Sequence, residues 1–391
     1  MSTAPGNPAP RSHNLKIAFY AGVVFLYWMS LYLYVPTLPV YAQTKTQDLA
    51  LVGTMLSMYG LWQMIIRLPV GIFSDWVGRR KPFIVVGLSL SALGAYWMGR
   101  AAGIQGMIVG RATTGLAAGT WVPLVVVFSG LFPPAEAVRA TALLNIISST
   151  SRLVSTTSTG FLNELGGYRL AYNLSAGVAV LAILAALLAP EKRLSGPTLS
   201  PRSIGSLITR RDVLLPSLLS AVTQYASWAS AFGFIPVLAK QFGASDLVEG
   251  LLMSLNIAIL IPGSLITNRL SGRIGARRLV YLSFAVLAGG IWIVAAANSL
   301  VWLVLSQIVT GLALGAVQPL LMGMSIERVQ GPERATAMGV HQSVYAIGMT
   351  AGPWLGGILA DAIGLQPMFA VTGVICLVLG VLGASLLPKP K

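Results

Sequence analysis

Acidic residues are scarce in this sequence, and charged residues of either sign are few. Among 391 residues there are 11 Asp and Glu against 26 Lys and Arg, and only 9% of the chain is charged. A water-soluble domain carries about 25% charged residues, so this chain cannot cover a soluble surface. Hydrophobic residues make up 55% of it, which indicates that lipid surrounds most of the chain. We interpret the basic excess as a membrane-orientation signal and expect no nucleic-acid partner.

Cysteine and histidine are also nearly absent. Cys376 is the single cysteine and lies in an apolar run, and His13 and His341 are the only histidines. One cysteine excludes a disulfide within the chain, no nearby His or Asn supports a catalytic thiol, and two histidines offer no metal site. The glycine-rich P-loop that would bind ATP is missing too. We therefore expect no enzyme activity, no cofactor and no metal.

Long apolar runs, in contrast, recur along the whole chain, and each is sufficient to cross about 30 Å of hydrocarbon. Because lipid offers no partners for backbone N–H and C=O groups, these runs predict helices. The predicted fold class is an all-α membrane protein with twelve transmembrane helices. They are predicted at residues 15–42, 49–74, 82–101, 104–131, 137–163, 169–189, 213–239, 247–268, 277–297, 300–325, 334–360 and 367–387.

Basic residues in the connections predict the orientation of the chain. One set of connections and tails holds 19 Lys and Arg residues, whereas the other holds only Lys45, Arg100, Arg169 and Lys240. Short connections rich in Lys and Arg stay on the cytoplasmic side of a membrane. We therefore expect both termini in the cytoplasm, and a multi-pass, monomeric protein whose partner is the lipid bilayer of the cell (inner) membrane.

A hydrophilic connection, rich in Pro, Ser, Gly and basic residues, divides the chain into two similar halves. At an offset close to 197, Gly53 aligns with Gly250 and Gly78 with Gly275. Two parallel repeats predict two six-helix bundles related by a pseudo-twofold axis, with a binding site near the midplane between them. The expected division is a disordered tail at 1–14, an N-terminal bundle at 15–189, a cytoplasmic linker at 190–212, a C-terminal bundle at 213–387 and a tail at 388–391.

The segment "GIFSDWVGRRKPF" follows the second predicted span. Its glycines allow close helix approach and a turn, and its basic residues hold the connection on the cytoplasmic side. This pattern resembles the signature loop of the major facilitator superfamily. The resemblance implies a gating motif in which Asp75 helps to close the cytoplasmic side, and the second half has Gly272 in its place. The predicted gating residues are Gly71, Asp75, Gly78, Arg79, Arg80, Lys81 and Arg139, an arginine near the start of span five.

Two further segments resemble patterns of drug–proton antiporters in that family. "MIVGRATTGLAAG" in span four carries Arg111, with Thr114 where glutamine is frequent. Arg111 is either neutralised by helix carbonyls or by reaching the membrane surface, or it couples protons or substrate. "GPWLGG" in span eleven permits packing and a hinge, but the family's antiporter motif of this kind belongs to span five. Span five has "STTSTG" instead, which counts against proton-driven drug export. The predicted packing residues are Gly352, Pro353, Gly356 and Gly357.

The deepest predicted ionisable side chains are Arg111, Arg152 and His341, and no acid falls at mid-membrane. Such a centre favours anionic or zwitterionic solutes. Arg152 either pairs with helix carbonyls or Asn145, or contacts substrate or a gate; His341 either packs or titrates. Asp246 and Glu249 are expected in solvent at a helix end. The predicted cavity-lining residues are Tyr27, Trp28, Tyr32, Asn145, Gln224, Tyr225, Trp228, Asn256, Gln318, Gln342 and Tyr345.

These features predict a secondary transporter that moves a small organic solute by alternating access, and the resemblance implies the direction of efflux. Proton coupling stays open, because span five lacks the family's antiporter motif. The resemblance is to the twelve-span drug/proton antiporter branch. One alternative is an organic anion or metabolite exchanger, or an uptake permease, with Arg111 and Arg152 as counter-charges. Another is a membrane receptor that transports nothing.

Overall fold

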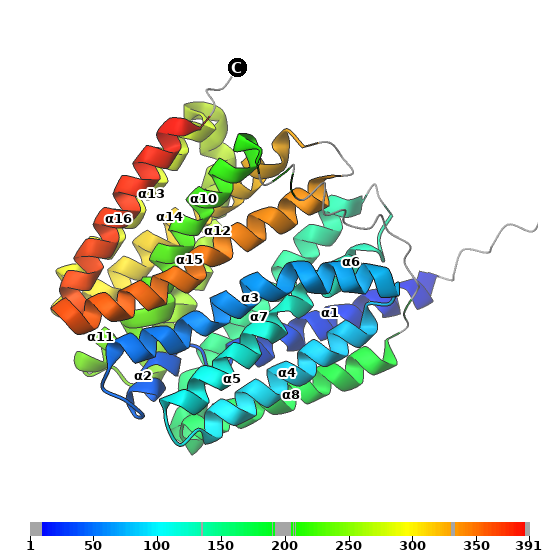
Figure 1. Cartoon of the computed structure of the whole chain (residues 1–391), viewed down its shortest axis with the longest axis horizontal. Helices are drawn as coiled ribbons and strands as arrows, with labels where there is room; N and C mark the ends of the chain where they lie inside the picture. The colour runs from blue at the N-terminus through cyan, green and yellow to red at the C-terminus, as the bar shows by residue number, and fades with distance from the viewer. Residues whose placement is uncertain are drawn as a thin grey trace, which may run out of the picture.

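The structure, a computed structural model, describes residues 10–133, 136–189, 191, 205, 207, 209–329 and 333–387. Helices joined by short connections make up these residues, and no strand occurs among them. Figure 1 shows two groups of helices side by side, the first coloured blue to green and the second green to red. The all-α fold predicted from the sequence is therefore confirmed.

The first helix group spans residues 10–189. Its elements are α1 (Pro10–Tyr32), α2 (Leu38–Gln43), α3 (Leu49–Val77), α4 (Lys81–Arg100), α5 (Ile104–Ala117), the 3₁₀ turn η1 (Ala118–Thr120), α6 (Trp121–Ser129), α7 (Ala137–Gly166) and α8 (Tyr168–Leu188).

The second helix group spans residues 211–387. Its elements are α10 (Arg211–Ala229), the π-helical turn η3 (Ser230–Phe234), α11 (Ile235–Gln241), α12 (Asp246–Ile274), α13 (Ala276–Ala295), α14 (Leu300–Glu327), α15 (Arg334–Ile363) and α16 (Leu365–Leu386).

Both groups present their helix ends on the same two sides of the molecule. We call the terminal side the one on which α1 begins and α16 ends, and the distal side the one on which α2 and α11 lie (Figure 1). The groups contact each other chiefly where α3 crosses α15 and where α7 crosses α12. Helices α1, α4, α5 and α8 pack within the first group, and α13, α14 and α16 within the second.

The helix boundaries of the first group recur in the second group. Helices α3 and α12 begin and end 197 residues apart, and so do α7 and α15. Gly78 and Gly275 end equivalent helices with φ of 65° and 82°, in a region that only glycine adopts without strain. The repeat predicted from the sequence is thus present in the helix ends and in the backbone conformation.

Ten helical segments in the described ranges are long and apolar enough to cross a membrane. The predicted spans at 137–163 and 213–239 also form helices, but α7 and α10 do not reach that hydropathy. Both carry many Ser and Thr residues, which lower the hydropathy without preventing a helix. The count of twelve spans stays a prediction.

Two boundaries differ from the prediction. Helix α1 begins at Pro10, where a disordered tail to residue 14 is expected. The first predicted span, 15–42, is interrupted between Tyr32 and Leu38, because Pro36 has no N–H to donate and clashes with the preceding turn. The described residues leave out part of the predicted N-terminal tail, 1–9, the whole predicted C-terminal tail, 388–391, and most of the predicted linker.

The Ser- and Thr-rich part of α7 satisfies its own hydroxyl groups. Ser155 donates to the carbonyl oxygen of Ser151 at 2.6 Å, and Ser158 donates to that of Val154 at 2.8 Å. Thr159 donates to the carbonyl oxygen of Leu33 in the connection after α1, at 2.9 Å. Hydroxyl groups that bond to helix carbonyls leave no unpaired donor in lipid, so this segment continues the helix.

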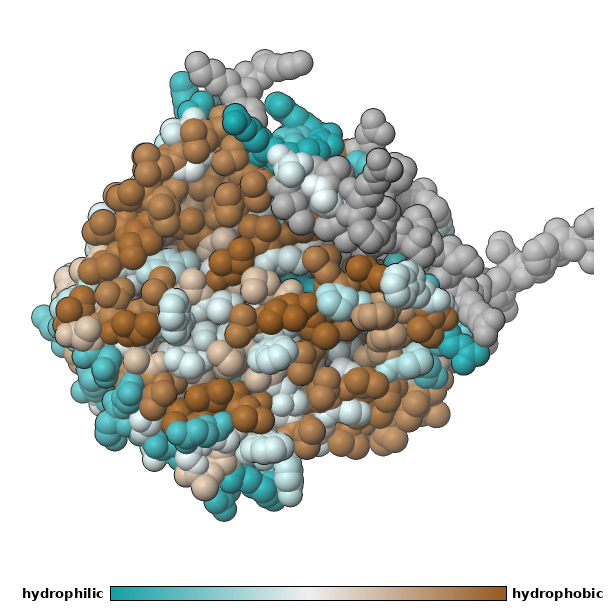
Figure 2. All heavy atoms as spheres, in the orientation of Figure 1, coloured by the Kyte–Doolittle hydropathy of each residue, from teal (hydrophilic) through white to brown (hydrophobic). Residues whose placement is uncertain are grey.

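Apolar side chains cover the sides of the helices. Figure 2 shows brown, hydrophobic residues over the flanks and teal, hydrophilic residues towards the helix ends on the face in view. Large apolar residues such as Leu188, Trp76 and Ile146 are more than half exposed. Exposed side chains of this size match lipid as the surrounding solvent.

Candidate functional site

A cavity of about 370 Å³ lies between the helix groups, in the terminal-side part of the helices. It is formed by α7 from the first group and by α10, α12, α14 and α15 from the second. Apolar residues such as Ile257, Leu314 and Met322 form part of its wall. Its polar lining residues are Asn145, Ser149, Arg152, Ser220, Gln224, Ser264, Gln318, His341, Gln342 and Tyr345.

Among the residues that the structure describes, Arg152 is the only Lys, Arg, Asp or Glu side chain that lines this cavity. Its Nε donates to the carbonyl oxygen of Ser148 at 3.3 Å, and its Nη2 donates to Ser149 Oγ at 3.4 Å. The guanidinium carbon lies 5.1 Å from the ring centre of Trp28 and 5.7 Å from that of Tyr32. These contacts hold the cation by long hydrogen bonds and aromatic faces, with no ion pair to it among the described residues. The site therefore presents a positive charge to whatever enters.

His341 also lines this cavity and bonds to Ser217 of α10. Its Nδ1 lies 3.1 Å from Ser217 Oγ, and Ser217 donates its only hydroxyl proton to the carbonyl oxygen of Val213 at 2.6 Å. Ser217 must then accept from Nδ1–H, which leaves Nε2 of the neutral ring as an acceptor. The His341 and Tyr345 rings meet edge to face at 5.9 Å.

Five of the eleven predicted cavity-lining residues line the cavity: Asn145, Gln224, Gln318, Gln342 and Tyr345. The other six, Tyr27, Trp28, Tyr32, Tyr225, Trp228 and Asn256, are not among the residues that line it. Asn256 instead donates to Gln307 and Thr310 between α12 and α14. Tyr27 donates to the carbonyl oxygen of Ala118. Asn256 and Tyr27 therefore bond to residues of their own helix group.

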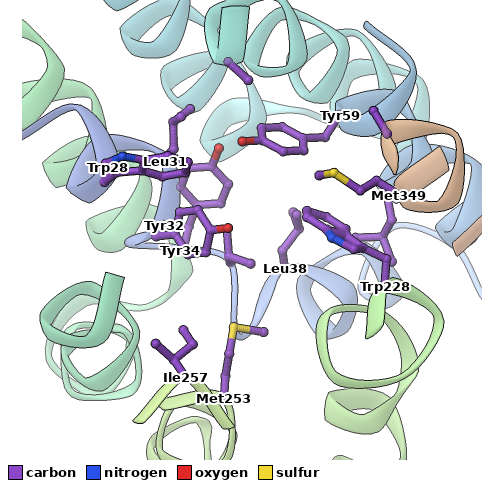
Figure 3. Packing of buried hydrophobic residues seen from close by; sticks show 14 of the residues in the cluster. Trp28, Leu31, Tyr32, Tyr34, Leu38, Tyr59, Trp228, Met253, Ile257 and Met349 are labelled. Atoms are coloured by element: carbon purple, nitrogen blue, oxygen red, sulfur yellow. The ribbon is translucent and has the colours of Figure 1, made fainter. Parts of the chain in front are cut away.

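Aromatic rings close the cavity towards the distal side. Trp28 meets Tyr32 edge to face at 5.6 Å, and Tyr32 meets Phe232 of the second group at 6.3 Å. Trp228 stacks on Phe232 at 4.9 Å and on Tyr59 at 5.5 Å. Figure 3 shows side chains from α1, α3, α10, α12 and α15 pointing toward one another here. We call the rings of Trp28, Tyr32, Tyr59, Trp228 and Phe232 the aromatic plug.

Arg111 lies apart from the cavity, with only 1% of its surface exposed. Its guanidinium carbon is 4.3 Å from the ring centre of Tyr59, and its Nε and Nη1 have no hydrogen-bond partner in the described part of the chain. The structure therefore shows neither the carbonyl pairing nor the surface position that were expected as alternatives. The face of a tyrosine ring takes the place of both.

Close packing of glycines seals the distal side. A Cβ added to Gly53 would lie 2.2 Å from the carbonyl oxygen of Pro353, and one on Gly357 would lie 2.5 Å from that of Leu49. On the other flank, a Cβ on Gly160 would lie 2.2 Å from Leu247 Cα. The predicted packing residues Gly352 and Gly356 lie against Tyr225 and Phe234 instead, within the second group.

Hydrogen bonds between the groups also concentrate on the distal side. Asn163 donates to Asp246 at 2.9 Å, and the hydroxyl groups of Thr156 and Ser254 lie 2.7 Å apart. Asp246 is mostly buried and Glu249 has 1% of its surface exposed, although the sequence places both in solvent. Contact between α7 and α12 is the reason, because it covers the first turn of α12.

The motif residues on the terminal side pair among themselves. Arg80 donates to Asp75 at 2.5 Å, while Arg139 is exposed and donates to Glu136 at 2.8 Å. The two predicted gating residues Asp75 and Arg139 therefore have different partners in this structure and do not bond to each other. Gly71 is buried in α3, Arg79 is exposed, and Gly78 ends α3.

Glu191 and Ser149 were not anticipated from the sequence as site residues. Glu191 accepts from the backbone N–H groups of Arg80 and Lys81, at 2.6 and 2.9 Å, and Lys81 Nζ donates to the carbonyl oxygen of Ala189 at 3.0 Å. Arg67 donates to Tyr345 at 2.9 Å across the group boundary. Helical spacing from Asn145 and Arg152 could have indicated Ser149, whereas no local signal marks Glu191. No cluster of metal-binding side chains occurs in the described ranges.

Comparison with known proteins identifies relatives of the whole chain. The family model described as Major Facilitator Superfamily matches residues 20–222 and 217–391. Multidrug resistance protein 1 of Bacillus subtilis is 22% identical over 92% of this chain and 93% of its own length. A chloramphenicol efflux pump of Mycobacterium tuberculosis is 25% identical over 88% of this chain and 86% of its own.

Solved structures share the fold at low sequence identity. A bacterial homologue of the human lysosomal transporter Spinster has a TM-score of 0.81 at 15% identity, over 97% of this chain and 98% of its own. The nucleoside transporter NupG has a TM-score of 0.76 at 16% identity, over 95% and 99%.

Proposed function

Because the chain belongs to the major facilitator superfamily, we propose that it exports small amphipathic organic molecules without positive charge, using the cavity around Arg152. Its family makes it a secondary transporter of the membrane and not an enzyme. In this proposal the chain has twelve spans in two six-helix bundles, and works as a monomer in the cell membrane. The terminal side faces the cytoplasm, so the cavity receives its substrate from there.

The observation that carries this proposal is the charge of the cavity wall. Arg152 is the only charged side chain in the described part of this wall, and its neighbours are amides, hydroxyl groups and the His341 ring. A cation would be repelled by Arg152, whereas an anionic or strongly polar group would be attracted to it. Apolar residues of α12 and α14 complete the wall and match the apolar part of an amphipathic molecule. Similarity to proteins named as efflux pumps supports the direction.

The difference between the two sides of the cavity supports alternating access. The aromatic plug and the glycine crossings close the distal side, while the gating residues Asp75 and Arg139 on the terminal side are not joined. In the proposed cycle, the distal contacts separate to release substrate and the terminal contacts form. Proton coupling supplies the driving force.

The test is transport in proteoliposomes by wild-type protein and by the Arg152→Ala variant. We expect a pH gradient to drive movement of chloramphenicol, an uncharged aromatic amide, and Arg152→Ala to slow it about tenfold, which corresponds to about 1.4 kcal/mol of lost interaction. Arg100→Ala is the matched control, because Arg100 is exposed on the distal side and bonds to Asn173. Export of a lipophilic cation that survives in Arg152→Ala would contradict the proposal.

An organic anion exchanger or uptake permease is the second candidate, and the exposed charge of Arg152 favours it. Arg111 would not contribute directly, because it lies outside the cavity. Exchange of a labelled organic anion that needs no pH gradient and disappears in Arg152→Ala would favour this candidate over export.

A further inference from the structure

A buried carboxylic acid lies at the distal contact between the helix groups. Glu249 is in the first turn of α12, its side chain is 0% exposed, and neither carboxyl oxygen has a hydrogen-bond partner among the described residues. The residue that follows it, Gly250, lies against the carbonyl oxygen of Thr156, where α12 crosses α7. The carboxyl group thus lies beside the contact between the two groups, where Asn163 of α7 donates to Asp246, one turn earlier on α12.

The groups that face Glu249 do not neutralise it. Lys240 of α11 lies 3.9 Å away, beyond hydrogen-bond distance, and is 43% exposed. Its Nζ lies only 2.9 Å from Asp246, one turn before Glu249 on α12. From α8, the Tyr168 hydroxyl lies 3.5 Å from Asp246, and from α7 the uncharged Asn163 donates to that residue. The one cation of this cluster is therefore already paired with Asp246.

The cluster has two charge states, which differ sharply in the free energy of burying Glu249. With Glu249 ionised, two carboxylates share one lysine, and the buried carboxylate has no donor among the described residues. With Glu249 protonated, the cluster is neutral. Burying an unpaired carboxylate costs far more than burying the neutral acid.

We propose that Glu249 is a proton-binding site of the distal gate, occupied while the groups touch on the distal side and released when they separate. The distal gate consists of Asn163, Lys240, Asp246, Glu249 and the crossing at Gly250. When it opens, water reaches the carboxyl group and stabilises the ionised form, and the proton passes to the distal solution. When it closes, a proton from that solution binds a carboxylate oxygen.

This site rests on the proposed transport cycle and adds pH control of its distal gate. Because the proton is taken from the distal solution and returned to it, no net proton crosses the membrane at Glu249, and this site does not supply the driving force. Because the closed gate binds the proton and the open gate releases it, acid on the distal side favours closure. In an exporter that order is productive: substrate leaves to the distal side, and proton binding there returns the cavity to the terminal side. A carboxyl group in the gate also explains how protons can act on a cycle whose central cavity has no acid among its described lining residues.

The gate can be observed directly, without any substrate. Spin labels at Ala102→Cys and Asn298→Cys, in a Cys376→Ala background, report the distance between exposed distal connections of the two groups. In wild-type protein, we expect the labels to move apart as pH rises from about 5 to about 8.5, a range in which a buried carboxyl group titrates. Label distances that do not change with pH would overturn the inference.

Two variants separate Glu249 from other titrating groups. Glu249→Gln keeps the side chain neutral and should abolish the pH-dependent change, with the labels at the short, closed distance throughout. Glu249→Asp retains a titrating carboxyl group and should retain the change. Glu164→Gln is the matched control, because Glu164 is an exposed acid near the distal end of α7. A pH response that persists in Glu249→Gln, or disappears in Glu164→Gln, would assign the switch to another residue.

The transport experiment on Arg152 and the spin-label experiment on Glu249 can fail independently of each other. If Arg152→Ala transports normally but the labels respond to pH through Glu249, the substrate site fails and the gate stands. If Arg152→Ala fails to transport and the labels ignore pH, the substrate site stands and the gate fails.

Discussion

Three arginines lie deep in the helices and have no carboxylate partner among the described residues; each lies over an aromatic ring instead. The guanidinium carbon of Arg67 is 5.5 Å from the ring centre of Tyr345, that of Arg111 is 4.3 Å from Tyr59, and that of Arg152 is 5.1 Å from Trp28. A planar, weakly hydrated cation stacks well on such rings. The lack of acids at mid-membrane could be predicted from the sequence. The ring partners could not, because each lies on a different helix.

At Arg111 the stacking should be sensitive to the shape of the cation. Arg111→Lys replaces a planar group by a compact, strongly hydrated ammonium, so we expect it to destabilise the protein by about 1–2 kcal/mol. Thermal unfolding in detergent, followed by tryptophan fluorescence, measures this as a lower midpoint. Arg100→Lys is the control, since Arg100 stacks on the half-exposed ring of Tyr96 at 3.9 Å in contact with solvent. Equal losses in both variants would contradict a role for burial.

Whole helices were easier to predict than their ends and faces. Each predicted span contains a helix, since apolar composition forces backbone groups to bond internally in lipid. The interruption before Leu38 follows from Pro36, a signal that was present but not used. The face that a helix turns to the cavity was predicted in part: Asn145 and Arg152 of α7 line it, whereas Trp28 and Tyr32 of α1 lie in the plug.

One prediction concerns how α4 is joined to the end of α8. Glu191 accepts two backbone N–H groups at the start of α4, so Glu191→Ala leaves both without that partner. We expect a loss of about 1–2 kcal/mol in unfolding free energy, seen as a lower thermal midpoint. Glu164→Ala removes an exposed carboxylate that caps no helix and should leave the midpoint unchanged. A midpoint for Glu191→Ala within error of wild type would show that the cap contributes nothing.

For the whole molecule, the relation between the two helix groups determines function. They touch through glycine crossings and hydrogen bonds on the distal side, and the cavity occupies the terminal-side part of the boundary. Closely packed interfaces of this kind have discrete arrangements and do not deform continuously. A small side chain added at a crossing should therefore shift the balance between closed and open states.

Gly53→Ala tests that balance. Its Cβ would lie 2.2 Å from the Pro353 carbonyl oxygen, so the distal side should close poorly, and the labels at residues 102 and 298 should move to longer distances. Transport of chloramphenicol should fall about tenfold or more, as expected when about 1.4 kcal/mol or more separates the two states. The control is Gly22→Ala in α1, where the added Cβ meets nothing within 4 Å. Unchanged distances in Gly53→Ala would mean that this crossing does not hold the closed state.

The sequence by itself determined the solvent of the chain, its helices, its repeat and its family, because apolar runs, basic connections and glycine motifs are local properties of consecutive residues. Only the tertiary structure decided which polar residues share the cavity, which rings hold the arginines, and that Glu249 is enclosed without a donor. Those outcomes depend on contacts between helices distant in sequence, such as α7 with α12. Their burial is set by the packing of two helix groups and not by any single segment.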